Sequence, residues 1–359
     1  MNLEDSDMYK KVCVLLVVSI LSAALMQSGC SPRQMQNHPV KGKITIGFSM
    51  DTLKEERWYK DEISFVKEVE KQNANIIVDI DYDDPAKQLE QVKQMVSQGI
   101  DALVIIPHDA KSAAAAVGYA KKNGVKVVSY DRLVLNAGAD LYISFDNVKV
   151  GELQASAMVK AVSHGNYVII NGPSTDNNTV MINKGIMNVL SPYVASGQIK
   201  IIKQTEAYDW MADEAHSCII GLRNEGQKID AVIAENDQLA GGAIDALSES
   251  RMIPAVPVAG MDADLAACQR VVEGQQYMTV YKPIDKLAVT AADIAVKMAR
   301  GETINAPDKL YDGAQNIPYL KIEPIAVLKS NMNSTVVKCG FHTVNEVYMN
   351  VPKSQWPSK

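Results

Sequence analysis

The feature that most constrains the fold of this chain is a regular alternation of short apolar runs with amphipathic segments, from about residue 44 to residue 300. Residues 102–106 are continuously apolar, which is typical of a strand buried on both faces of a parallel sheet. Residues 56–72 instead place Ile63, Val66 and Val69 at helical spacing. Strands that alternate with helices in this way predict an α/β fold with doubly wound parallel sheets.

The alternation occurs twice with similar spacing, which predicts two architecturally equivalent units. The first has expected strands at residues 44–49, 76–82, 102–106, 125–130 and 141–145, and expected helices at 56–72, 85–98 and 110–123. The second has expected helices at residues 148–162, 179–190, 211–224, 237–250, 263–273 and 284–300, and expected strands at 167–171, 199–204, 231–234, 256–260 and 278–281. We therefore expect two Rossmann-like lobes that face each other across a cleft.

Length and composition agree with this expectation and exclude other classes of protein. The 359 residues correspond to about two domains of roughly 150 residues each. Acidic residues exceed basic ones, 42 to 36, and aromatic residues make up 6%, so the chain lacks the positive charge and stacking side chains that nucleic-acid binding needs. The five histidines have no paired metal-ligand spacing. We expect no metal, no cofactor and no nucleic-acid partner.

The N-terminal segment is different in kind. Residues 12–26 are uncharged and mostly apolar, which is too short for a membrane span but suits the core of a secretory signal peptide. Ser28 and Gly29 precede Cys30 as in a bacterial lipoprotein signal, which predicts cleavage after residue 29 and lipidation of Cys30. A plain signal peptide or a retained anchor is the alternative. The acidic residues before Met8 do not suit a signal, so Met8 is an alternative start.

Three further cysteines, Cys218, Cys268 and Cys339, follow at wide spacing in the exported part of the chain. Their odd number and spacing do not form a disulfide framework or a metal site. We expect them to be small buried hydrophobic residues, and their redox state stays open.

Polar and aromatic residues gather where expected strands end. In open α/β sheets, ligands bind beyond the carboxyl ends of the strands, so these side chains are expected to converge on one rim. The candidate ligand-binding residues are Arg57, Trp58, Asp131, Arg132, Asp176, Asn178, Trp210, Asn236, Asp262 and Lys282.

This mixture suits an uncharged sugar. Adjacent hydroxyls both donate and accept hydrogen bonds, so carboxylates and amides together with Arg and Lys satisfy a polyol ring. The flat rings of Trp58 and Trp210 suit the apolar faces of a pyranose. Taken singly, each residue has a structural alternative: Asn236 can be a helix cap, Asp176 can belong to a turn, and either tryptophan can be a core residue. The coincidence at so many strand ends favours a binding site.

Several long segments carry a resemblance to a known family. They are DTLKEERWYKD, GIDALVIIPHDA, YDRLV, YISFDNVKVGELQA, GPSTDNN, ENDQLAGGAIDALS, GMDADLAACQR and MTVYKPI. These segments closely resemble the D-xylose-binding proteins of bacterial ABC transporters, a group within the type I periplasmic sugar-binding proteins. The resemblance runs from about residue 43 to residue 347. Glu235 departs from it, because small residues are commoner there, and is expected to affect selectivity.

The resemblance implies a function and a domain organisation. It implies that the polar candidates hydrogen-bond a pentose, that Trp58 and Trp210 sandwich its ring, and that the lobes close about a hinge of three crossovers near residues 145–147, 282–284 and 316–322. The divisions that it implies are an N-terminal lobe at 43–145 and 283–316 and a C-terminal lobe at 146–282 and 317–347. The residues outside the resemblance are expected to form a lipoprotein-type signal peptide at 1–29, a linker at 30–42 and a frayed tail at 348–359.

The expected role is therefore that of an extracytoplasmic monomer, tethered to a membrane through a lipid on Cys30, that delivers a monosaccharide to an ABC permease in the inner membrane. D-xylose is the favoured ligand, and another pentose or a hexose is the alternative. A sensor that presents its closed form to a chemoreceptor or histidine kinase would share the fold. An α/β enzyme acting on a free sugar is a further alternative, although the cations beside the rim carboxylates favour binding over catalysis.

Overall fold

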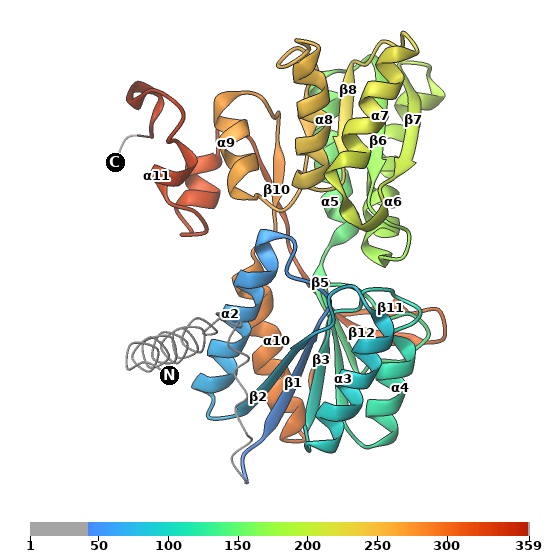
Figure 1. Cartoon of the computed structure of the whole chain (residues 1–359), viewed down its shortest axis with the longest axis vertical. Coiled ribbons are helices and arrows are strands. Elements are labelled where there is room, and N and C mark those ends of the chain that lie inside the picture. Colours follow the sequence, from blue (N-terminus) through green and yellow to red (C-terminus); the bar gives the residue numbers. More distant parts are fainter. Residues whose placement is uncertain (1–41, 358–359) are drawn as a thin grey trace, which may run out of the picture. The chain divides into compact units, whose positions relative to one another are not determined.

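A computed structural model describes residues 42–357, which fold into two lobes that are each built on a parallel sheet (Figure 1). Both lobes belong to one unit of the chain, Pro39–Lys359. The expected signal peptide, nearly all of the expected linker and the candidate lipidation site Cys30 lie outside the described residues. Among residues 42–357, no helix combines the length and the apolar character needed to cross a membrane.

The N-terminal lobe contains seven strands and four helices. The strands are β1 (Thr45–Met50), β2 (Asn75–Ile80), β3 (Ala102–Ile105), β4 (Lys126–Tyr130), β5 (Leu141–Phe145), β11 (Asp308–Tyr311) and β12 (Asn316–Ile322). The helices are α2 (Glu56–Lys71), α3 (Pro85–Ser97), α4 (Ala114–Lys122) and α10 (Ile284–Ala299). The sheet order is β11-β12-β5-β4-β3-β1-β2, with every pair parallel except β11 with β12.

The apolar strands of this lobe are buried because helices cover both faces of the sheet. In β3, Ala102 and Val104 belong to the core cluster that includes α2 and α10, whereas Leu103 and Ile105 belong to the cluster that includes α3 and α4. Successive residues of a strand point to opposite faces, so a continuous apolar run is what a sheet covered on both sides requires.

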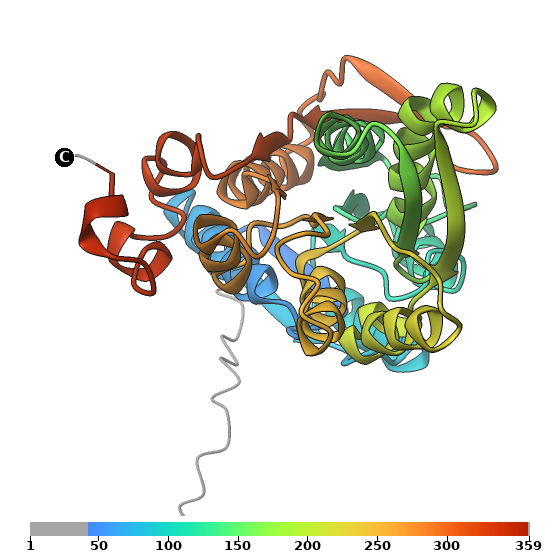
Figure 2. The same cartoon turned by 90° about the horizontal axis from the view of Figure 1, so that it is seen from above.

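The C-terminal lobe repeats this plan with a smaller sheet (Figure 2). Its strands are β6 (Gly165–Asn171), β7 (Ile199–Glu206), β8 (Ala231–Ala234), β9 (Val258–Ala259), β10 (Thr279–Tyr281) and β13 (Ile325–Val327), and its α-helices are α5 (Asn147–Ala161), α6 (Asn177–Ala195), α7 (Ala212–Asn224), α8 (Asp237–Glu249), α9 (Leu265–Glu273) and α11 (Val344–Val347). The parallel sheet has the order β7-β6-β8-β9, and β10 pairs with β13 in antiparallel fashion. Helices α5 and α6 pack on one face of the four-stranded sheet, and α7 and α8 on the other.

The segment after α10 differs most from the expectation. It forms three strands, β11, β12 and β13, that were not among the expected elements, and β12 pairs with β5 in the N-terminal sheet. The chain therefore returns to the C-terminal lobe after Ile322, not at residue 316, before β13 pairs with β10. The boundary expected between residues 316 and 317 therefore falls inside β12 (Asn316–Ile322).

The C-terminal tail also differs from the expectation of a frayed end. Tyr348 is buried in a cluster with α9, and the Trp356 indole N–H donates to the backbone oxygen of Val351 at 3.1 Å. Of the three cysteines that were expected to be buried, Cys268 is buried, Cys218 is half-buried and Cys339 is exposed. The described part of the tail is thus anchored to the C-terminal lobe through Tyr348, Val351 and Trp356.

Candidate functional site

All ten candidate residues line one pocket between the two lobes. Arg57 and Trp58 come from the first turn of α2, and Asp131 and Arg132 follow β4. The opposite wall comes from the C-terminal lobe, and Lys282 lies between β10 and α10. That wall comprises Asp176, Asn178, Trp210, Asn236 and Asp262. Sequence reasoning missed three further lining residues, Glu55, Ile182 and Met261.

The charged side chains of the pocket are paired with one another. Arg57 Nη2 lies 2.7 Å from Asp131 Oδ2, Lys282 Nζ lies 2.8 Å from Asp262 Oδ1, and Arg132 Nε lies 2.9 Å from Asp176 Oδ2. All six residues are buried. Burial penalises an isolated charge heavily, and each ion pair offsets part of that penalty.

Arg57 also forms an ion pair with Asp61, which lies one turn further along α2. The Arg57 Nε lies 3.2 Å from Asp61 Oδ2, and the hydroxyl of Tyr130 donates to the other oxygen of Asp61. Burial raises the pKa of Asp61 to about 6, although Arg57 opposes this rise. Burial also works against the charge of Arg57, but Asp131 and Asp61 outweigh it and raise the pKa of that guanidinium. The guanidinium is therefore permanently charged and fixed in direction.

Three of the pocket residues have a positive φ, a backbone conformation that residues other than glycine seldom adopt. Asp131 has φ 59°, Trp210 has φ 57° and Asp262 has φ 104°. The backbone oxygen of Asp131 accepts hydrogen bonds from Tyr142 Oη at 2.9 Å and from Ser144 Oγ at 2.6 Å, which hold this residue in place. Such strain persists only where the surroundings determine it, and it concentrates at ligand sites.

Two candidate residues also cap helices, which was the structural alternative for Asn236 but not for Asp176. The Asp176 carboxylate accepts from the backbone N–H of Asn178 at 2.8 Å at the start of α6, and Asn236 Oδ1 accepts from the N–H of Leu239 at 2.9 Å at the start of α8. Asp176 still has its second oxygen on Arg132, and Asn178 Nδ2 donates across the pocket to Asp131 at 3.2 Å. Capping and pocket roles are therefore combined.

The two tryptophans occupy different settings. Trp58 donates its indole N–H to Glu55 Oε2 at 2.7 Å, and the guanidinium carbon of Arg57 lies 4.2 Å from its ring centre. Trp210 packs on the backbone at Gly172, where an added Cβ would lie 2.3 Å from the Cη2 atom of the indole. The position of Trp210 thus depends on a residue without a side chain.

Glu235, the departure that is expected to affect selectivity, is not among the residues that line the pocket. It is fully buried, and its two oxygens accept from Asn171 Nδ2 and from the backbone N–H of Gly172, each at 2.7 Å. Burial raises its pKa to about 8, against the opposing effect of these hydrogen bonds. Glu235 thus holds the backbone at Gly172, and Trp210 packs against that backbone.

One group among residues 42–357 has donor atoms close enough together for a metal ion. The ligand atoms of Asp51, Asp83 and His108 all lie within 4.8 Å of one another. Asp51 Oδ2 already lies 2.5 Å from Arg132 Nη1, and Asp83 Oδ2 lies 2.6 Å from Lys54 Nζ. The group therefore belongs to a network of ion pairs that reaches Arg132 through Asp51.

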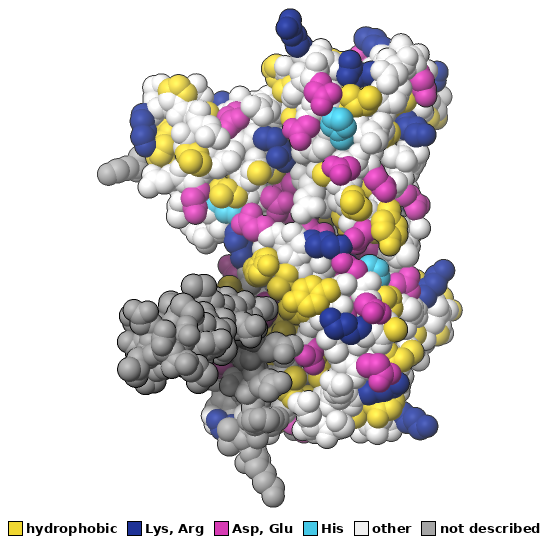
Figure 3. Space-filling model, in the orientation of Figure 1, with side chains coloured by type: hydrophobic (Ala, Val, Ile, Leu, Met, Phe, Trp, Pro, Cys, Tyr) yellow, Lys and Arg dark blue, Asp and Glu magenta, His cyan; other side chains and the backbone are white. Residues whose placement is uncertain are grey.

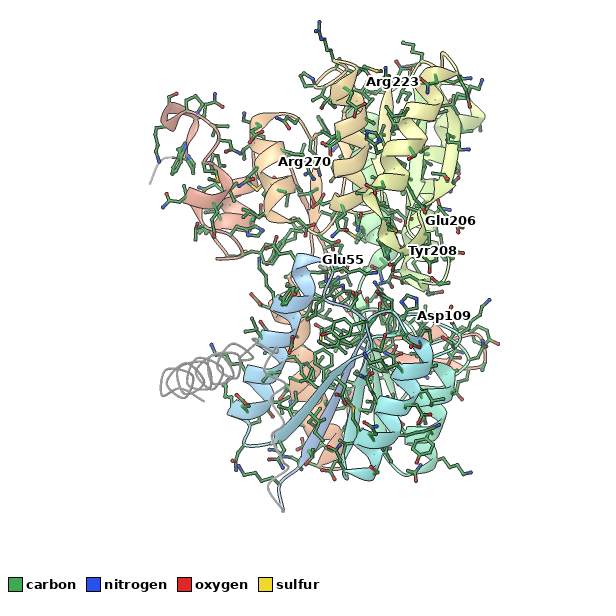
Figure 4. The ribbon with its side chains drawn as sticks, in the orientation of Figure 1. Glu55, Asp109, Glu206, Tyr208, Arg223 and Arg270 are labelled. Carbon is green, nitrogen blue, oxygen red and sulfur yellow. The ribbon has the colours of Figure 1, made fainter. Side chains whose placement is uncertain are left out.

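Contacts around the rim also join the lobes. The Leu265 N–H donates to Glu56 Oε2 at 3.1 Å, and the Ala110 N–H donates to the Thr175 oxygen at 3.0 Å. Acidic and basic side chains lie side by side where the lobes meet (Figure 3). A second hollow shares Arg132, Asp176 and Trp210 with the pocket, and Asp109 and Tyr208 line it from opposite lobes (Figure 4).

Comparison with known proteins places the chain among binding proteins. The sequence profile of one protein family, the periplasmic binding protein domain, matches residues 46–303. The D-xylose-binding periplasmic protein of Haemophilus influenzae is 45% identical over 306 residues, which cover 85% of this chain and 92% of the relative. The protein of the same name from Escherichia coli is 43% identical, with coverage of 85% and 93%.

A solved structure agrees. A solute-binding protein of an ABC transporter from Clostridium phytofermentans, with bound β-D-glucose, has a TM-score of 0.80 and 26% identity, covering 84% of this chain and 99% of that one. This similarity confirms the expected type I fold of two doubly wound lobes.

Proposed function

Since the chain belongs to the family of periplasmic binding protein domains, we propose that it captures a monosaccharide, D-xylose, outside the cytoplasm and delivers it to an ABC transporter permease. Family membership also makes the chain a binding protein and not an enzyme, and implies a periplasmic location. D-xylose is chosen because the two relatives described above carry that specificity in their names, at 45% and 43% identity.

The observation that carries the proposal is the pairing of charges in the pocket. Arg57, Arg132 and Lys282 each have a carboxylate partner within 3 Å, so the pocket presents strong donors and acceptors without a free cation for an acidic ligand. An uncharged polyol is matched to such a site because each hydroxyl both donates and accepts. The ten candidate residues would bind the sugar as the sequence predicted.

Closure of the lobes is the proposed mechanism. Asn178 and Asp176 from one lobe already contact Asp131 and Arg132 from the other. A sugar held between these pairs would contact both walls, and a ligand shifts a conformational equilibrium only by its differential affinity for the two states. The sugar would therefore stabilise the closed form, which the permease would recognise.

The cellular arrangement completes the proposal. We place the protein, as a monomer, at a membrane through a lipid on Cys30, with its permease in the inner membrane. The support is the small pair Ser28-Gly29 before Cys30, after an apolar run. Metabolic labelling with a fatty-acid analogue is expected to mark the wild-type protein and not Cys30→Ser, whereas equal labelling of both would remove the anchor from the proposal.

The central test is calorimetric titration of residues 31–359 with pentoses and hexoses, supported by thermal shift. We expect saturable binding of D-xylose and a rise in melting temperature that follows ligand concentration by mass action. Binding of a different sugar alone would overturn the xylose assignment but leave monosaccharide capture intact. If no sugar in the panel binds, the proposed function is wrong.

A further inference from the structure

Glu55 is a pocket residue that the strand-end pattern did not predict. It lies immediately before α2, in the space between the lobes, beside Arg57 and Trp58 (Figure 4). The residue is 7% exposed, although acidic residues at the start of a helix are usually solvated. Its side chain makes no capping hydrogen bond to α2, so helix capping does not account for its burial.

The hydrogen-bonding capacity of Glu55 is only partly used. Its Oε2 accepts from the Trp58 indole at 2.7 Å. Apart from its own backbone N–H, no other group among residues 42–357 donates to this carboxylate. An ionised carboxylate has about four acceptor positions, so Glu55 brings unused acceptors to the wall of the pocket.

Glu55 also differs from the other pocket carboxylates in its charge partners. Asp131, Asp176 and Asp262 each have a cation within 3 Å, whereas no cation of the described chain forms an ion pair with Glu55. Burial raises the pKa of Glu55 despite the attraction of Arg132. A buried carboxylate with free acceptors and no cation is costly unless a donor reaches it, and the pocket that Glu55 lines is where a ligand hydroxyl would supply that donor.

We propose that Glu55 is a specificity-determining residue that accepts a hydrogen bond from one hydroxyl of the bound monosaccharide, beside the Trp58 ring. This inference rests on the proposed function and extends it to a residue outside the predicted set. One carboxylate would then both orient the Trp58 indole and read the position of a single hydroxyl.

The test combines two variants with a set of sugars that each lack one hydroxyl. Glu55→Gln keeps an acceptor for the Trp58 N–H but removes the charge, and Glu55→Leu removes both. Calorimetry with D-xylose and with its four monodeoxy analogues gives a thermodynamic cycle for each hydroxyl. We expect Glu55→Leu to weaken D-xylose binding roughly 10- to 100-fold, and Glu55→Gln to weaken it less.

The cycle separates direct contact from an effect through Trp58. We expect one analogue to lose clearly less affinity than the other three when Glu55 is replaced by Leu, because the hydroxyl that Glu55 recognises is already missing from it. An equal loss for every analogue would overturn the inference, since Glu55 would then act only by holding Trp58. Unchanged affinity for D-xylose in both variants would also overturn it.

Controls keep this outcome distinct from failure of the proposed function. Glu70→Gln, an exposed acid on the same helix, is expected to leave affinity unchanged. Melting temperatures without sugar establish that each variant is folded, and Glu55→Gln carries the test if Glu55→Leu unfolds. If wild type binds another monosaccharide, its deoxy analogues replace those of xylose. If wild type binds none, both proposals fail, whereas normal wild-type binding without coupling at Glu55 removes this inference alone.

Discussion

The Nε atom of Arg132 lies 2.9 Å from Oδ2 of Asp176, and this ion pair joins the two lobes across the pocket. Arg132 also reaches Asp51 at 2.5 Å on its own lobe, so the guanidinium is held in place before it meets the other lobe. Because Arg132 and Asp176 belong to opposite lobes, the pair exists only when the lobes are together. Both residues are buried.

Asp176→Asn tests this pair without removing the helix cap. Asparagine caps a helix about as well as aspartate, so we expect the free energy of unfolding to change by less than about 1 kcal/mol. Loss of the charge is expected to weaken sugar binding roughly 10- to 150-fold and to increase the radius of gyration without ligand, measured by calorimetry and small-angle scattering. Asp245→Asn, on the exposed face of α8, is the matched control. Unchanged affinity would show that the pair does not support binding.

Asp262→Ala is expected to abolish tight binding while the protein stays folded. The substitution leaves the buried Lys282 without the partner that lies 2.8 Å from it, at a cost of about 2–5 kcal/mol, or roughly 30-fold to several thousandfold in Kd. Because Asp262 has φ 104°, Asp262→Asn is the better-tolerated second variant. Calorimetry and circular dichroism measure the two effects, and wild-type affinity in either variant would contradict the assignment.

Gly172→Ala is expected to displace Trp210. The new Cβ would lie 2.3 Å from the indole, whereas at Gly221 in α7 an added Cβ meets nothing within 4 Å. We expect Gly172→Ala to weaken sugar binding at least tenfold and to change tryptophan fluorescence. Gly221→Ala should keep affinity and gain up to about 1 kcal/mol in stability. Equal affinity in the two variants would show that Trp210 does not contribute to binding.

The buried Glu235 is expected to make stability fall as pH rises. Its pKa is raised to about 8 from an ordinary 4.5, so the folded state holds a proton that the unfolded state has lost between these values. Stability from this group is full below about pH 4.5 and is lost toward pH 8, at no more than about 1.4 kcal/mol per pH unit.

Denaturant unfolding of wild type and Glu235→Gln between pH 5 and 8.5 measures this contribution. The difference in unfolding free energy between the two proteins should move in favour of the variant as pH rises. A difference that does not depend on pH would mean that Glu235 is ionised in the folded protein.

The main elements of the fold could be predicted because buried α/β strands and amphipathic helices have strong patterns. The expected strand at residues 141–145 is β5 (Leu141–Phe145) as observed, and the helix expected at 85–98 is α3, with Pro85 in its first turn. The strand β11 was missed because it is a sheet-edge strand with the sequence DKLY, in which no residue is fully buried. Pairing between β12 and β5 joins segments far apart in the sequence, which no local pattern contains.

The candidate site could be predicted where a residue follows a strand, because topology places strand ends together. All ten such residues line the pocket, although their contact with a sugar stays a prediction. Glu55 was missed because it precedes a helix among other charged residues, where solvent exposure is the ordinary expectation. The contact between Glu235 and the backbone at Gly172 could not be predicted from the sequence either, since it joins two residues that are far apart along the chain.

The pairing of β12 with β5 has a consequence for how the chain reaches its native state. The N-terminal lobe takes α10, β11 and β12 from residues that follow the whole of the C-terminal α/β sheet, and α10 supplies Leu287, Ala291 and Ala295 to its core. Contacts of such long sequence separation slow folding, because the entropy of closing a large loop is lost before they form. The lobe that is synthesised first is therefore completed only after Ile322, the last residue of β12, has been synthesised.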